Sequence, residues 1–422
     1  MSIQSSNKDP YASLRIKEFR IYLSARILTT IGLLMQSTIV AWQVYEITND
    51  KLALGLIGLS EAIPFILTTF YSGYATDKFN RKKLLVAFTW ILAACSFLLV
   101  LLNFYGNSFF PKYGVLPIYI IIAISGIARS FIAPTTQAIQ ARIVPRGLYA
   151  NASTWSSNIF QIGAVIGPLI GGVVLELTNP TVSFSIVVIL IATSAILKSF
   201  ISDQPIAKEV KHESFFKSLK EGLRFVFKSQ PIVSSISLDL FAVLFGGVVA
   251  LLPAFCKDIL GVGPTALGLL RGSQFMGSAI MGFALAYFPP LKNAGRNLLI
   301  SIALFGVCII GFALSEVYWL SFLFLFLSGA FDNVSVIIRS TILQLYTPDA
   351  MRGRVSSVNS LFIKSSNEIG DFESGVAAKL LGLVPAVIFG GSMTLLVVGF
   401  TYWFAPSLRK IDLTKDPEQL IQ

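Results

Sequence analysis

The sequence predicts an all-α membrane protein in which twelve transmembrane helices form two pseudo-symmetric halves of six helices each. Three observations support this fold class: an apolar composition, a succession of long apolar runs, and a repeat between the two halves of the chain. Hydrophobic residues make up 54% of the 422 residues, and charged residues make up only 13%. Because a soluble domain carries roughly 25% charged residues, this composition is typical of a membrane protein.

Each predicted span is a mostly apolar run of about 20 residues or more, the length that a helix needs to cross a bilayer. Since the backbone must satisfy its own hydrogen bonds in lipid, runs of this length indicate helices. The predicted spans are 21–46, 52–76, 84–105, 116–142, 150–177, 181–202, 231–256, 265–289, 297–315, 317–345, 354–382 and 384–405.

Basic residues predict the orientation of the chain. They concentrate in every second connection and in both tails, whereas the other connections hold little more than Lys51, Lys112 and Lys257. The positive-inside rule therefore places both termini in the cytoplasm, and we expect a multi-pass protein of the plasma membrane. The net charge of +11 follows from this topology, so we expect no nucleic-acid partner.

The spans and connections divide the chain into two helical halves, a linker and two tails. The expected segments are a cytoplasmic N-terminal tail (1–20), the first half (21–202), a cytoplasmic linker (203–230), the second half (231–405) and a cytoplasmic C-terminal tail (406–422).

The linker contains one amphipathic stretch. Phe215, Leu219, Leu223 and Val226 share one helical face, and lysines lie elsewhere. This pattern predicts a helix on the cytoplasmic membrane surface, and a plain solvated linker is the alternative.

The two halves repeat without a gap at an offset of 203 residues, as between Ser125 and Ser328 (328 − 125 = 203). The same offset maps Pro145 onto Pro348, a matched proline in a matched turn. Duplicated halves can rock about a site near the bilayer midplane and expose it to each side in turn.

The connection after the second span reads GYATDKFNRKK. With twelve spans in two halves, it resembles the gating loop of the major facilitator superfamily, in which a glycine, an aspartate and a basic pair follow one another at intervals of four residues. Gly73, Asp77, Arg81 and Lys82 match, and Asn80 stands where glycine is usual. The resemblance implies a charge-stabilised latch through Asp77. An ordinary positive-inside loop is the alternative.

The fifth span contains QIGAVIGPLIGG, which resembles the exporter signature G-x-x-x-G-P-x-x-G-G of the same superfamily. Glycines four residues apart let another backbone approach closely, and a proline kinks the helix. The resemblance implies a hinge and seal against the other half, and efflux by antiport rather than uptake. Generic small-residue packing is the alternative. The matching residues are Gly163, Gly167, Pro168, Gly171 and Gly172.

A closer resemblance covers nearly all of residues 10–405. FDNVSVIIRSTILQLYTPDAMRGRVSSVNSLFIKSSNEIGDFESG in the tenth and eleventh spans, LDLFAVLFGG in the seventh and GLSEAIPF in the second are similar to the branch that contains enterobactin exporters and secretion transporters. This resemblance implies export of a siderophore-like metabolite across a bacterial inner membrane, and amphipathic drugs are the fallback substrates.

The expected activity is secondary active export of a small molecule, driven by protons. The sequence has no G-x-x-x-x-G-K-[ST] motif for direct use of ATP. A lipid or lysolipid translocator of the same superfamily is the alternative. A membrane-embedded enzyme is disfavoured, because the one histidine, His212, lies in the linker. We expect a monomer with no cofactor and no metal site.

Charges inside the spans are the candidate site residues, since a charge near the midplane costs roughly 3 kcal/mol or more. Arg129 and Asp332 are related by the repeat offset and are expected to attract each other across the cavity, unless each has a local partner. Asp239 is the first candidate to carry the proton, and Glu368 and Asp371 share a helical face as a second. The proton-coupling candidates are Asp239, Asp332, Glu368 and Asp371, and the other cavity charges are Arg26, Glu61, Arg129 and Arg339.

Overall fold

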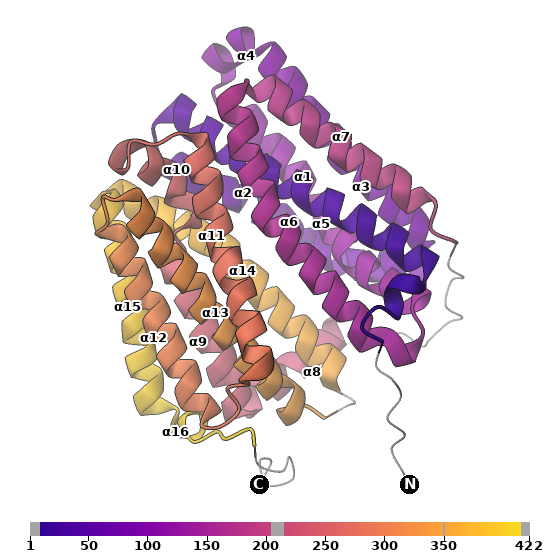
Figure 1. The fold of residues 1–422 in the computed structure, drawn as a ribbon, viewed down its shortest axis with the longest axis vertical. Helices are drawn as coiled ribbons and strands as arrows, with labels where there is room; N and C mark the ends of the chain where they lie inside the picture. Colours follow the sequence, from indigo (N-terminus) through magenta and orange to yellow (C-terminus); the bar gives the residue numbers. More distant parts are fainter. Residues whose placement is uncertain (1–8, 204–214, 349–350, 415–422) are drawn as a thin grey trace.

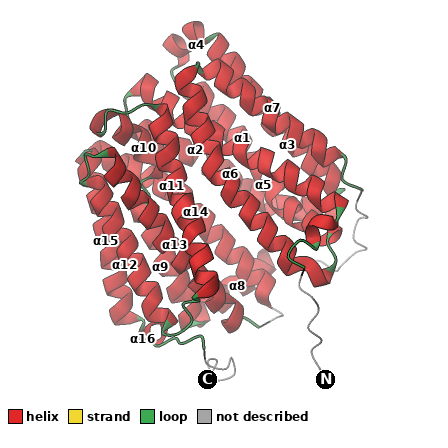
Figure 2. Ribbon diagram, viewed as in Figure 1, coloured by secondary structure: helices red, strands yellow, loops and turns green. Residues whose placement is uncertain are grey.

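Two bundles of long helices lie side by side in the computed structural model, which describes residues 9–203, 215–348 and 351–414 (Figure 1). These residues contain helices and loops and no strand (Figure 2), which confirms the all-α prediction. The first bundle consists of α1 (Lys17–Thr48), α2 (Lys51–Lys78), α3 (Arg81–Phe104), α5 (Leu116–Ile143), α6 (Tyr149–Leu177) and α7 (Pro180–Ser199), with the short α4 (Gly106–Tyr113) at one end.

The second bundle repeats this arrangement with α9 (Gln230–Gly246), α11 (Pro264–Tyr287), α12 (Ala294–Ala313), α13 (Tyr318–Tyr346), α14 (Arg352–Leu381) and α15 (Leu383–Phe404). Short helical turns flank the long helices of both bundles: Ser13–Arg15, Arg146–Leu148 and α16 (Pro406–Arg409).

The seventh predicted span, 231–256, is not one helix as expected. After Gly246 the chain continues through a 3-10 turn (Val249–Leu251), α10 (Leu252–Ala254) and a π-helical turn (Phe255–Ile259). The Gly246-Gly247 pair explains the break, because glycine weakens a helix interior. The carbonyl group freed at Gly247 accepts a hydrogen bond from Ser374 Oγ at 2.7 Å.

Ten helices of the described chain are long and apolar enough to cross a membrane. The predicted spans 265–289 and 354–382 are also helices, α11 and α14, but they are not among these ten. Helix α14 carries many polar and charged residues, among them Lys364, Glu368 and Asp371, which lower its mean hydropathy. The all-α membrane fold is therefore confirmed, whereas composition alone supports ten of the twelve spans.

The predicted amphipathic helix of the linker forms as α8 (Phe215–Lys228). Val226 is 1% exposed and packs in a cluster with Ile232 of α9 and Val358 of α14. We expected this apolar face to lie on the membrane surface. Instead, the part around Val226 is buried against the second bundle. The side chains of Phe215 and Leu219 lie outside the described ones.

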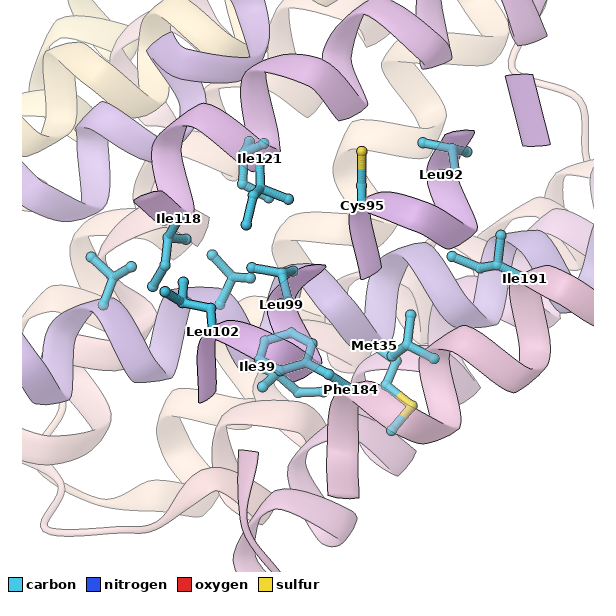
Figure 3. Close-up of a cluster of buried hydrophobic side chains, with 14 of the residues drawn as sticks. Met35, Ile39, Leu92, Cys95, Leu99, Leu102, Ile118, Ile121, Phe184 and Ile191 are labelled. Carbon is cyan, nitrogen blue, oxygen red and sulfur yellow. The ribbon is translucent and has the colours of Figure 1, made fainter. Parts of the chain in front are cut away.

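The core of the first bundle fixes α1, which also borders the second bundle. Met35 and Ile39 of α1 pack against side chains of α3, α5 and α7 (Figure 3). The labelled partners in this core are Leu92, Cys95, Leu99, Leu102, Ile118, Ile121, Phe184 and Ile191.

The two ends of the molecule differ in charge. The basic end, which lies at the bottom of Figure 1, carries the connections 78–81, 143–149 and 287–294, the end of α13 and the start of α14. The opposite end carries the connections 48–51, 104–116, 177–180, 246–264, 313–318 and 381–383.

Candidate functional site

The two bundles meet along two helix pairs, α6 with α11 and α2 with α14. In the first pair the backbones touch directly: a Cβ atom on Gly172 would lie 2.2 Å from the carbonyl oxygen of Pro264, and one on Gly268 would lie 2.3 Å from that of Pro168. Only glycine permits so close an approach.

The exporter-signature residues are divided between two partners. Gly163, Gly167 and Gly171 face α1 of the same bundle, where added Cβ atoms would lie 2.8–3.1 Å from Thr30, Ile31 and Met35. Gly172 and the carbonyl group of Pro168 instead face α11. Helix α6 therefore lies between α1 and the second bundle, in the position expected of a seal, and its role as a hinge remains a prediction.

The second pair, α2 with α14, brings the predicted carboxylates Glu368 and Asp371 to the boundary between the bundles. A Cβ atom on Gly58 would lie 2.9 Å from Cβ of Asp371 and 3.1 Å from the carbonyl oxygen of Glu368. One turn along each helix, Gly55 and Gly375 face each other. The small residues of α2 thus place both carboxylates against the other half.

These carboxylates belong to a group of charges that spans both bundles. Glu61 of α2 and Arg129 of α5 form an ion pair. Lys364 of α14 reaches across, with Nζ 4.1 Å from the ring centre of Phe65 of α2. Glu368 interacts electrostatically with all three of these charges and with Asp371. We call Glu61, Arg129, Lys364, Glu368 and Asp371 the interface charge cluster.

The expected attraction between Arg129 and Asp332 is wrong for this conformation, because Arg129 pairs with Glu61 within its own half. The reason is the close contact of α2 with α5: a Cβ atom on Gly126 would lie 2.6 Å from the carbonyl oxygen of Glu61. One turn beyond Gly126, Arg129 then meets the side chain of Glu61. Asp332 has no ion-pair partner among the described residues.

Arg271 of α11 is a site residue that sequence reasoning missed. Its Nη1 lies 3.3 Å from the hydroxyl oxygens of both Ser37 and Thr38 on α1, so the side chain crosses between the bundles. It also interacts electrostatically with Asp371. Its position as a charge inside the predicted eighth span was the available signal.

Asp239 and Arg339, predicted for separate roles, form an ion pair inside the second bundle between α9 and α13. Their side chains are only 8% and 5% exposed. Neither residue belongs to the interface charge cluster. The geometry therefore favours Glu368 and Asp371 over Asp239 as the carboxylates whose charge acts on the contact between the two halves.

The gating-loop residues lie at the basic end. Gly73 and Asp77 are in the last turns of α2, and Arg81 and Lys82 begin α3. Arg81 Nε donates a hydrogen bond to the carbonyl oxygen of Thr76 at 3.2 Å. Asn80 accepts one from the backbone N–H of Lys83 at 3.0 Å, so it caps α3 where the family usually has glycine.

The latch itself remains a prediction, because the side chain of Asp77 lies outside the described ones. Arg26 also lies toward the basic end, where its Nη1 donates a hydrogen bond to Tyr22 Oη at 3.1 Å.

Polar contacts between the bundles close the opposite end. Lys379 Nζ lies 3.0 Å from Asp50 Oδ2, and Asp258 accepts a hydrogen bond from Tyr45. Glu176 Oε2 accepts a hydrogen bond from the backbone N–H of Thr265, with the nitrogen 2.8 Å away.

The ionisation of Asp50 follows from these contacts. Partial burial alone would raise the pKa of Asp50, but hydrogen bonds from Lys379 and from the N–H of Leu52 outweigh burial and hold this pKa below its usual value. The neighbouring charges of Lys379 and Lys51 act in the same direction.

Toward the basic end, the contacts between α6 and α11 become looser. The last hydrogen bond that joins these two helices among the described residues runs from Gln161 Nε2 to Ser278 Oγ, and it is long, at 3.5 Å. Beyond it, Ser153 and Ser157 of α6 are exposed and line a cavity. The arrangement is thus closed at the opposite end and open at the basic end.

Comparison with known proteins explains this arrangement. A family model described as transmembrane secretion effector matches residues 8–419. The chain belongs to this family. It is therefore a membrane transporter of the major facilitator superfamily.

Named relatives of this transporter are enterobactin exporters. Those of Escherichia coli O1:K1 and of Citrobacter koseri are each 24% identical to it, over alignments that cover 88% of this chain and 86% of the relative.

Solved structures share the fold. A bacterial homologue of the human lysosomal transporter Spinster, in an inward-facing and unoccupied conformation, matches with a TM-score of 0.68 at 15% identity, over 97% of this chain and 99% of that one. A POT family transporter in complex with 5-aminolevulinic acid matches with a TM-score of 0.74 at 11% identity, over 93% and 96%.

Proposed function

We propose that this transporter is a secondary active exporter. It moves a small amphipathic metabolite, siderophore-like compound or drug out of the cytoplasm of a bacterium by proton antiport and alternating access. The observation that carries the proposal is the interface charge cluster, in which two carboxylates of α14 pack over Gly58 of α2. The named relatives support export of a siderophore-like compound.

The direction of opening supports uptake of substrate from the cytoplasm. The basic end is open, and the positive-inside rule assigns it, together with both termini, to the cytoplasmic side of the inner membrane. The contacts of Asp50 with Lys379 and of Glu176 with Thr265 close the outer route. A solute therefore enters from the cytoplasm in this conformation.

The charges at the α2–α14 contact support proton coupling. Glu61, Glu368 and Asp371 lie near one another, and like charges at short range repel. Protons bound to Glu368 or Asp371 reduce this repulsion and stabilise the contact between the halves, which keeps the outer route closed. Proton release to the cytoplasm weakens the contact and favours opening to the outside with substrate bound.

In this cycle protons and substrate cross the membrane in opposite directions, as antiport requires. Protons taken up from outside close the outer route again, and the empty transporter returns to face the cytoplasm. One charge that crosses 100 mV supplies about 2.3 kcal/mol. At about 1.4 kcal/mol per tenfold change, this energy sustains a concentration ratio of roughly fifty.

The test uses inside-out vesicles with an imposed proton gradient and a panel of siderophores and amphipathic drugs. We expect gradient-driven accumulation by the parent protein that a protonophore abolishes. The double variant Glu368→Gln/Asp371→Asn should lose accumulation and should also slow exchange of labelled for unlabelled substrate, because its neutral side chains mimic the protonated state and keep the outer route closed. Glu373→Gln, on the same helix, is the matched control and should accumulate substrate normally.

Two outcomes contradict the proposal. Accumulation that survives in the Glu368→Gln/Asp371→Asn variant would place coupling elsewhere. Movement of a labelled lipid or lysolipid between leaflets, without transport of any soluble compound, would make the protein a lipid translocator.

A further inference from the structure

Each half of the molecule has a cavity at the basic end. The first, of about 430 Å³, lies between α1, α5 and α6, and the second, of about 290 Å³, lies between α13 and α14. Neither cavity contains a residue of the interface charge cluster. They are thus separate from the proton-coupling site proposed above.

The two cavities occupy equivalent positions in the repeat. The offset of 203 residues maps six residues that line the first cavity onto six that line the second. The polar pairs are Gln137 with Ser340, Tyr149 with Arg352, Ser153 with Ser356 and Ser156 with Asn359. This correspondence shows that the cavities are a built feature of both halves rather than accidental gaps in packing.

Both cavities lie on helix faces that point toward the other half. Ser157 and Ser153 are one and two turns from Gln161, which reaches Ser278 of the second bundle. Ser356 is two turns from Lys364, which reaches Phe65 of the first bundle. The cavities therefore line the two walls of the route that is open at the basic end.

The chemistry of the two linings is the same. Each contains one arginine, Arg26 or Arg352, together with hydroxyl and amide groups, and the described residues of neither lining include a carboxylate. Guanidinium, hydroxyl and amide N–H groups donate hydrogen bonds to oxygen acceptors and attract negative charge. A lipophilic cation finds no carboxylate partner among these described lining residues.

Hydrogen bonds between neighbouring side chains fix the orientation of Arg26, Gln140 and Ser156 in the lining of the first cavity. Arg26 donates to Tyr22 at 3.1 Å, and Tyr22 and Ser156 donate to Gln140 Oε1 at 3.1 Å and 3.0 Å. In the second cavity, the side-chain oxygens of Asn359 and Thr347 are buried without a hydrogen-bond partner among the described residues. Since an amide oxygen only accepts hydrogen bonds, a bound solute satisfies Asn359 through a hydroxyl group and not through its anionic oxygens.

We propose that the two cavities are paired entry sites for an anionic, oxygen-rich solute, which presents carboxylate, phenolate or carbonyl groups to Arg26 in one half and to Arg352 in the other. The inference rests on the proposed export function, because the sites must face the compartment from which the solute is taken. It narrows the substrate class from amphipathic compounds in general to anions with several oxygen acceptors.

The test compares two dyes with the same xanthene core and opposite charge, carboxyfluorescein and rhodamine 123, in energised inside-out vesicles. We expect carboxyfluorescein to accumulate in preference to rhodamine 123. Arg26→Gln and Arg352→Gln should each raise the KM for carboxyfluorescein about tenfold, as expected for loss of one charge-assisted hydrogen bond, with kcat little changed. Arg26→Lys and Arg352→Lys should restore part of the affinity.

Arg146→Gln is the matched control, because Arg146 is an exposed arginine of the basic end that lines neither cavity. Equilibrium binding of carboxyfluorescein to the purified protein, followed by fluorescence polarisation, decides the matter even for a variant that does not transport.

Three results overturn the inference: preferential accumulation of rhodamine 123, no binding of carboxyfluorescein by the parent protein, or equal affinities of the Arg26→Gln, Arg352→Gln and Arg146→Gln variants. Gradient-driven transport of rhodamine 123 would leave the export proposal standing, so the two failures are distinguishable.

Discussion

Gly172 is the position where a single methyl group should shift the equilibrium between the inward-open and outward-open states. In the closed outer route, a Cβ atom there would lie 2.2 Å from the carbonyl oxygen of Pro264, and 2.9 Å from its carbonyl carbon. Both atoms belong to backbone, so no side chain can rotate away. Gly172→Ala should therefore force α6 and α11 apart at the opposite end.

The size of the effect follows from the cost of overpacking, about 1–3 kcal/mol. At about 1.4 kcal/mol per tenfold change, the closed population falls by roughly five-fold to a hundred-fold relative to the open one. The effect should be specific to the contact between the bundles, because Gly172 meets Pro264 and Thr265 of the second half there.

Cross-linking with a short bifunctional maleimide measures this shift away from the substituted site. Asp50→Cys and Lys379→Cys place a cysteine pair across the contact between the start of α2 and α14, where Lys379 Nζ lies 3.0 Å from Asp50 Oδ2 in the native protein. In a background with Cys95, Cys256 and Cys308 replaced by serine, Gly172→Ala should slow cross-linking of this pair several-fold.

Gly399→Ala serves as the control, since no atom lies within 4 Å of a Cβ atom built at that helical glycine. It should leave the cross-linking rate unchanged. A folded Gly172→Ala protein that cross-links as fast as its parent would refute the reasoning, because it would show that the α6–α11 contact does not control closure.

Three further predictions concern charge and packing. The contacts of Asp50 lower its pKa, so its carboxylate stabilises the closed outer route fully above the ordinary pKa of about 4, and this stabilisation is lost as the pH falls through the lowered pKa. Thiol accessibility at the opposite end should rise over that acidic pH range. Asp50→Asn should remove the pH dependence. Arg339→Met should lower the stability of the detergent-solubilised protein by about 3–5 kcal/mol in thermal unfolding, because it leaves Asp239 charged and buried, and Asp239→Leu should recover much of the loss. Val226→Ala should cost about 1.5 kcal/mol, from about 0.8 kcal/mol per buried methylene, and should speed proteolysis of the linker, whereas an unchanged rate would show that α8 is not held by this contact.

The sequence predicts the long helices well, because the length of an apolar run is set by the thickness of the bilayer. It predicts less well where local backbone chemistry overrides the run, as at Gly246-Gly247, where the seventh span breaks. The repeat correctly relates the positions of equivalent helices. It does not reveal which side chains meet, because the partner of Arg129 depends on the close approach of α2 at Gly126.

The charged residues of the candidate site were found by their type and depth, but their pairing was not. Asp239 and Arg339 are a hundred positions apart in the chain, and no local spacing predicts their contact. Arg271 was overlooked for the same reason, since the hydroxyl groups that it contacts lie on α1 in the other half.

Glycine-to-backbone contacts at both helix pairs have a consequence for the speed of transport. Smooth surfaces of this kind can slide or roll with few rotamer changes, unlike interlocked side chains that must first withdraw. Packing then contributes little friction to reorientation, and the activation barrier resides mainly in breaking the polar contacts of Asp50 with Lys379 and of Asp258 with Tyr45. Turnover should accordingly vary with ionic strength more than with membrane viscosity.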